Sequence, residues 1–216
     1  MSATPASPIA MPFGEPTPFG LFGLSIGCAS LLPIAFGMPD ALNAEGLQTA
    51  AWFCLLFGGG CQFLAGLMSF ANKNALGGTL LTTFSFNWVM NWWALSSLAS
   101  GHKVNSTIIL AVDLCFLLIF LVMTYAFGFF SKLLFAFLAV IDVLYLCRIG
   151  KEVLHAQAAF ALPIALSTVA LMAIALYIAF AMVLNPTAGR VILPIPGPLF
   201  APQLPAAAPV AVSPQP

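Results

Sequence analysis

Long apolar runs separated by short polar connections dominate the hydrophobic pattern of this chain. A helix that crosses a bilayer needs about 20 consecutive apolar residues. Six runs reach this length, and the connections between them hold most of the charged side chains. The expected spans are Phe19–Met38, Leu47–Phe70, Leu76–Ala99, Ser106–Phe127, Phe130–Ile149 and Phe160–Leu184. The pattern therefore predicts an all-α, polytopic membrane protein with six transmembrane helices.

Composition supports the same class of protein. Of the 216 residues, 62% are hydrophobic and 6% are charged, whereas a soluble domain carries about 25% charged residues. The lipid bilayer is therefore the expected environment, and the net charge of zero gives no indication of nucleic-acid binding. We expect a transmembrane domain over residues 15–193, with disordered tails rich in Ala and Pro at 1–14 and 194–216. No residue pattern predicts a metal site or a cofactor.

A glycine-bearing stretch opens the first expected helix. Gly20, Gly23 and Gly27 are spaced by three and four residues, which puts them on one helical face. Small-residue faces usually allow close packing of membrane helices. The same face could instead line a narrow substrate pathway, and both interpretations stay open.

Four motifs resemble those of the acetate uptake transporter family, which includes the bacterial succinate-acetate permeases. Residues 15–21 resemble its opening Asn-Pro-x-Pro-Leu-Gly-Leu signature, with Glu15 and Phe19 as the departures. Residues 58–66 are similar to its Gly-Gly-x-x-Gln-x-x-Ala-Gly pattern, and residues 74–79 to the connection that follows. Residues 189–194 resemble its closing Gly-Arg-x-x-Leu-Pro. The motifs occur in the family's order, so the resemblance covers most of the chain.

The resemblance implies a function and an assembly. It implies a pathway within each protomer for small monocarboxylates such as acetate, with succinate as a further candidate, either channel-like or driven by proton symport. It also implies a homohexamer in the plasma (inner) membrane with both termini in the cytoplasm. Basic residues are evenly divided between the two sides, so the positive-inside rule does not decide the orientation.

The family's pore is closed by three apolar side chains, which correspond here to Leu24, Phe84 and Ile141. A hydrophobic ring of this kind can close a pore by excluding water. Polar residues in the second and third expected helices are candidates for the substrate pathway: Gln62, Thr82, Asn87 and Asn91. An amide at bilayer depth is costly unless it is hydrogen-bonded, so Gln62 and the Asn87/Asn91 face are expected to point into the protein.

Two carboxylates lie within apolar runs. Ionisable residues at membrane depth are functional candidates by default, and Asp113 and Asp142 are the candidates here for proton coupling. Folding the two helices about Gly128 places both carboxylates away from the termini, at heights that differ by about 4 or 5 Å. No basic residue lies in the neighbouring turns of Asp142, and burial disfavours a charged carboxylate. We therefore expect Asp142 to be largely protonated near neutral pH. A structural hydrogen bond between the helices is the alternative.

Other functions remain to be weighed. The two aspartates, and the absence of basic residues inside the expected helices, would also suit a pore for ammonia, ammonium or another small neutral or cationic solute. An enzyme is not expected, because no catalytic cluster is visible in the sequence. A sensory or assembly protein that kept the fold but lost transport is a further alternative.

Overall fold

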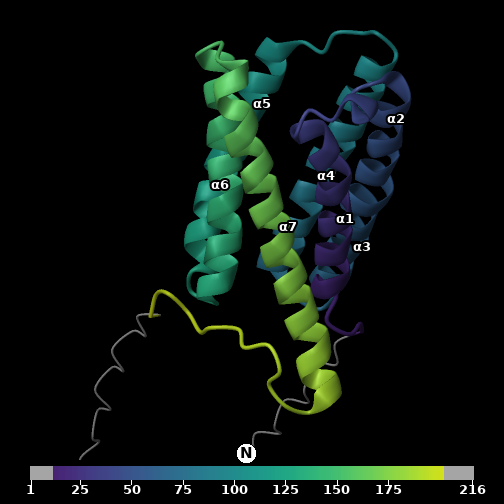
Figure 1. The fold of residues 1–216 in the computed structure, drawn as a ribbon. Coiled ribbons are helices and arrows are strands. Elements are labelled where there is room, and N and C mark those ends of the chain that lie inside the picture. Colours follow the sequence, from purple (N-terminus) through teal and green to yellow (C-terminus); the bar gives the residue numbers. More distant parts are fainter. Residues whose placement is uncertain (1–11, 202–216) are drawn as a thin grey trace, which may run out of the picture.

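The computed structural model describes residues 12–201, and their regular structure is entirely helical. The helices form six rods that run roughly side by side (Figure 1). Three segments join end to end in the second rod. The elements are α1 (Thr17–Ala35), the short 3-10 helix η1 (Pro39–Ala41), α2 (Ala44–Phe53), η2 (Cys54–Cys61), α3 (Gln62–Ala71), α4 (Ala75–Ala99), α5 (Ser106–Phe127), α6 (Lys132–Val153) and α7 (Gln157–Ala188). The predicted all-α fold class is confirmed, and the six rods correspond to the six expected helices.

Short polar residues set the starts of most rods. Asn43, Asn74, Asn105 and Ser131 each accept a hydrogen bond from a backbone N–H in the first turn that follows. Such caps satisfy donors that have no partner inside the helix. At the other end of the chain, α7 stops at Gly189, whose φ of 63° suits a residue without a side chain. These caps define where the rods begin and where α7 ends.

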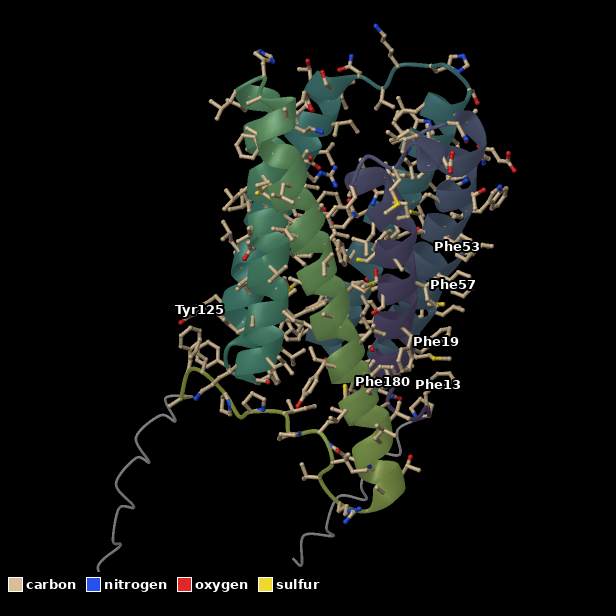
Figure 2. The ribbon with its side chains drawn as sticks, viewed as in Figure 1. Phe13, Phe19, Phe53, Phe57, Tyr125 and Phe180 are labelled. Carbon is tan, nitrogen blue, oxygen red and sulfur yellow. The ribbon has the colours of Figure 1, made fainter. Side chains whose placement is uncertain are left out.

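Five rods are long and apolar enough to cross a membrane by length and composition. The rod that does not qualify is α4, whose sequence includes Thr, Ser and Asn residues. Its polar and aromatic side chains at Ser85, Asn87 and Trp88 are buried inside the protein. Apolar side chains elsewhere project away from the bundle, as Figure 2 shows for Phe53 and Tyr125. The bundle is thus apolar outside and partly polar within, as expected of a protein in lipid.

The second rod departs from the uniform helix expected from the sequence. Its middle part, η2, is a π-helix of 8 residues. In a π-helix each backbone hydrogen bond spans one residue more than in an α-helix. This part contains Gly58, Gly59 and Gly60. A side chain at Gly58 would overlap the Trp88 ring, so the glycine lets α4 approach the widened turns closely. Such π turns are frequent at functional sites.

The helix α7 joins two groups of rods, because it packs against α1 on one side and α6 on the other. Figure 1 shows α7 crossing between the α5–α6 hairpin and the group formed by α1 to α4. The side chains between these two groups form one cluster of buried apolar residues, drawn from α1, η2, α4, α5, α6 and α7. This cluster is where the candidate site lies.

The glycine face of α1 is occupied by other helices. A Cβ at Gly20 would lie 3.0 Å from the Ala65 Cβ, and one at Gly27 would lie 2.9 Å from the Trp88 ring. At Gly23 it would overlap Cys61 and a backbone carbonyl of η2. These positions match the packing interpretation of the glycine face.

The first and the last described segments of the chain are hydrogen-bonded to the same face of the bundle. The side-chain amide of Asn72 forms hydrogen bonds with the backbone of Phe13 and Gly14. Residues 1–11 lie outside the described structure. The expected tail at 194–216 starts with a segment that is held in place, whereas residues 202–216 are outside the described part.

The segment after α7 crosses this face to the α5–α6 hairpin (Figure 1). The Ser131 hydroxyl donates to the carbonyl of Pro196, at 2.8 Å. The Gly128 carbonyl accepts from the backbone N–H groups of Leu199 and Phe200, at 2.8 and 3.1 Å. The docked part of the chain therefore extends well beyond α7.

Candidate functional site

Two cavities open toward opposite ends of the bundle. The first, the terminal-side cavity, has a volume of about 320 Å³ and reaches the face that holds the chain ends; α1 contributes Thr17 and Leu21 to its wall. The second, the far-side cavity, has a volume of about 330 Å³, and α1 contributes Cys28 and Leu31. Because the second pair begins about two turns beyond the first along α1, the cavities lie in series along the bundle.

Phe84 lines both cavities. Its side chain is 4% exposed, and its ring packs against the Phe120 ring with centroids 5.1 Å apart. Leu24 and Ile141 are completely buried and belong to the same apolar cluster. An apolar layer that includes Phe84 therefore separates the cavities.

The amides expected to point into the protein do so. Gln62 is 1% exposed and lines the terminal-side cavity, where its Oε1 has no partner among the described residues. Asn87 and Asn91 both line the far-side cavity. Thr82 lines neither cavity; its hydroxyl donates to the Gly78 carbonyl at 2.7 Å. The three amides thus line cavities, whereas the Thr82 hydroxyl is hydrogen-bonded within its own helix.

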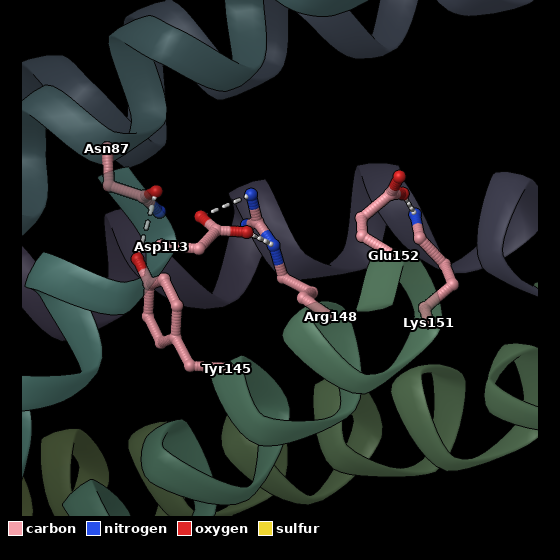
Figure 3. Close-up of polar contacts among 6 residues, drawn as sticks. All are labelled: Asn87, Asp113, Tyr145, Arg148, Lys151 and Glu152. Carbon is pink, nitrogen blue, oxygen red and sulfur yellow. Dashed lines mark hydrogen bonds and ion pairs between the residues drawn. The ribbon is translucent and has the colours of Figure 1, made fainter. Parts of the chain in front are cut away.

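The two aspartates have separate partners, which corrects the expected arrangement. Asp113 binds Arg148 through two hydrogen bonds, Nε to Oδ2 at 3.0 Å and Nη2 to Oδ1 at 2.9 Å (Figure 3). Arg148 belongs to α6, so the helices do contain a basic residue that pairs with a carboxylate. Asp142 lies six residues before Arg148 on α6, which is about 9 Å along the axis. The expected near-equal height of the two aspartates was wrong.

Asp142 is bound to α5 through Thr124. The Thr124 hydroxyl donates to Oδ2 at 2.6 Å, while Oδ1 is buried without a partner in the described part of the chain. Asp142 is 6% exposed and lines neither cavity. It lies beside Ile141 in the sequence, at the level of the apolar layer, and the hydrogen bond between helices matches the structural alternative for this residue.

The sequence analysis did not identify Tyr145 and Arg148, two polar residues that line the far-side cavity. Tyr145 donates through its hydroxyl to the Asn87 Oδ1 at 3.0 Å, which joins α6 to α4 (Figure 3). The Arg148 guanidinium carbon lies 5.3 Å from the centre of the Tyr145 ring. Tyr145 and Arg148 are one turn apart on α6, and that spacing was the available signal.

The terminal-side cavity differs in its polar groups. Glu15 lines it and accepts hydrogen bonds from the backbone N–H and the hydroxyl of Thr17. The far-side cavity instead contains Arg148 and Lys151. Within residues 12–201, no group of three His, Cys, Asp or Glu side chains could hold a metal ion.

The six-rod bundle, apolar outside and holding two cavities in series, is that of a polytopic membrane protein. The fold is that of the bacterial acetate channel SatP: the structures match with a TM-score of 0.74, over 85% of this chain and 99% of that one, at 21% sequence identity. The family resemblance of the motifs is thereby confirmed at the level of the fold.

A curated relative gives a second point of comparison. A 94-residue stretch is 38% identical to the glyoxylate pathway regulator of Yarrowia lipolytica. The match covers 42% of this chain and 32% of that protein, so the chain spans about a third of the relative's length. No family model matches the chain.

Proposed function

We propose that this protein is a membrane channel or transporter for small monocarboxylates such as acetate. One observation carries the proposal: Phe84 borders both cavities, which supports a path along the bundle that is interrupted by an apolar layer. The fold shared with an acetate channel supports this solute class. Catalysis of bond chemistry is not part of the proposal.

In this proposal Leu24, Phe84 and Ile141 form the constriction. A narrow apolar passage expels water and so stops small polar solutes. A monocarboxylate carries a methyl or short alkyl group that suits the apolar layer, and its carboxylate needs hydrogen-bond donors on either side. Gln62 in one cavity and the Asn87/Asn91 face in the other are placed to provide them.

Proton coupling is the role proposed for Asp142. A buried carboxyl is favoured in its neutral form, and a neutral carboxyl within the layer would not repel a passing anion. Asp113 is a weaker candidate than expected, because Arg148 holds both of its oxygens. We further propose that both termini face the cytoplasm of a homohexamer in the inner membrane, as the family resemblance implies. Cross-linking of the purified protein tests the hexamer.

Flux measurements in proteoliposomes test the function. Labelled acetate should enter liposomes that contain the protein faster than protein-free liposomes, and more so with an inward proton gradient. Labelled methylammonium serves as the contrasting solute. Uptake of methylammonium without uptake of acetate would reject the monocarboxylate assignment in favour of a cation or ammonia pore.

A further inference from the structure

The far-side cavity has a donor-rich wall centred on Arg148. Asp113 occupies Nε and one N–H of Nη2, and a guanidinium has five N–H donors. Three donors therefore remain on the edge that Asp113 does not cover. Arg148 lines the cavity, whereas Asp113 is 3% exposed and does not. Asp113 thus holds the guanidinium from the side away from the cavity, and the remaining N–H donors are free to bind a ligand.

The neighbouring groups add further donors. Because the Asn87 Oδ1 accepts from Tyr145, the amide N–H groups of Asn87 remain as donors toward a ligand. Trp88 also lines the cavity, and its buried Nε1 has no partner within the part of the chain that is described. The Asn87 oxygen in this wall is already bonded by Tyr145, and behind the wall both Asp113 oxygens are bonded by Arg148; the Asn91 amide, which also lines the cavity, can donate as well as accept. Such a set suits a carboxylate, which only accepts hydrogen bonds.

The local charge suits weak, reversible binding. Arg148 is balanced by Asp113, and Lys151 is paired with Glu152 at 3.2 Å (Figure 3). An unbalanced arginine would hold an anion tightly, whereas conduction requires that a bound ion can leave. Asp113 therefore both orients the guanidinium and moderates its attraction for an anion.

We propose that Arg148 binds the carboxylate of the transported acid in the far-side cavity, and that Asp113 is the positioning residue which keeps this binding weak. The inference rests on the proposed function and deepens it by assigning a substrate-binding group. It also assigns selectivity: a charged carboxylate should be recognised here, and a neutral molecule of the same shape should not.

The test compares acetate with acetamide, its neutral isostere. Arg148→Gln alone would leave Asp113 buried without its partner and endanger folding. The double variant Asp113→Asn/Arg148→Gln keeps two groups that can hydrogen-bond each other and removes both charges. In this variant the half-saturating acetate concentration should rise about tenfold or more, since charge-assisted bonds are roughly twice as strong as neutral ones. Acetamide flux should stay within about twofold of the wild type.

The single variant Asp113→Asn separates positioning from mere structural support. Its amide oxygen can still accept from Arg148, but the charge is gone, so acetate should bind more tightly and leave more slowly. The half-saturating concentration and the maximal flux should both fall. A purely structural role for Asp113 would lower the maximal flux without tightening binding, and that result would overturn the positioning role.

A binding measurement keeps the two proposals distinguishable. Acetate titration of the detergent-solubilised protein should change the tryptophan fluorescence, because Trp88 lines the cavity, and the change should be absent in the double variant. Trp88→Phe identifies the origin of the signal. Wild-type acetate flux with no effect of the double variant on flux or fluorescence would overturn the Arg148 site alone. Binding to the wild type without acetate flux would overturn the proposed transport function alone.

Discussion

Replacing Phe84 by Ala should open the layer between the two cavities. The ring is the side chain common to a cavity of about 320 Å³ and one of about 330 Å³, so its removal joins them into one water-accessible space. A polar solute in the wild-type layer would leave hydrogen bonds unmade, at a cost of about 1–3 kcal/mol for each buried group. Restoring one such hydrogen bond should therefore raise passive leak by about 5- to 150-fold.

Phe120→Ala is the matched control. Phe120 is completely buried and packs edge-to-face against Phe84, but it lines neither cavity. Both variants lose a buried ring, which costs about 3–5 kcal/mol in a well-packed core, so both should show a lowered midpoint of thermal unfolding. Leak of a small neutral solute from loaded proteoliposomes should rise only in Phe84→Ala.

Two results would refute the reasoning. One is a folded Phe84→Ala protein whose proteoliposomes hold the solute as well as the wild type, which would place the barrier elsewhere. The other is equal leak in Phe120→Ala, which would mean that loss of any core ring loosens the bundle. In either case Phe84 would be a packing residue of α4.

Two further predictions concern the packing and the buried carboxyl. Gly58→Ala should destabilise the protein by about 1–3 kcal/mol, because the new methyl group overlaps the Trp88 ring. Gly60→Ala is the control and should change stability little, because no atom lies nearer than 3.7 Å to the new Cβ. Thermal unfolding in detergent measures both variants, and equal unfolding midpoints would contradict the prediction. Asp142→Asn keeps the shape of the side chain and the hydrogen bond from Thr124, but it cannot titrate. After correction for free acetic acid, acetate flux should therefore depend less steeply on pH than in the wild type. An unchanged pH profile at normal expression would leave Asp142 a structural residue.

The helices and the buried amides could be predicted because each depends on local sequence. Apolar runs of sufficient length predict spans directly, and an amide such as Gln62 must find the interior wherever its helix is placed. The helix α4 is less apolar than the other rods, but it could be predicted in the same way, because Ser85 and Asn87 are buried inside the protein.

The partner of Asp113 could not be predicted from the same local information. Folding the two helices about Gly128 puts Asp113 near the height of Asp142, whereas in the structure its partner is Arg148, six residues further along α6. The difference arises because the connection between α5 and α6 extends from 128 to 131 and the offset of the two helices depends on their packing. A shift of this size decides whether the carboxylate meets an apolar residue or a guanidinium.

The π-helical part of the second rod gives that rod a tolerance to length change that the other rods lack. Removing one residue from an α-helix rotates everything beyond it by about 100°, so a deletion within α4 would carry Asn87 away from its cavity. In η2 the wide turns already contain surplus chain, and loss of Gly60 lets them close to ordinary α turns. The faces of α2 and α3, Gln62 included, then keep their directions. Among natural variants of this protein, single-residue changes in helix length should accordingly be more frequent in η2 than in the α-helical parts of the rods.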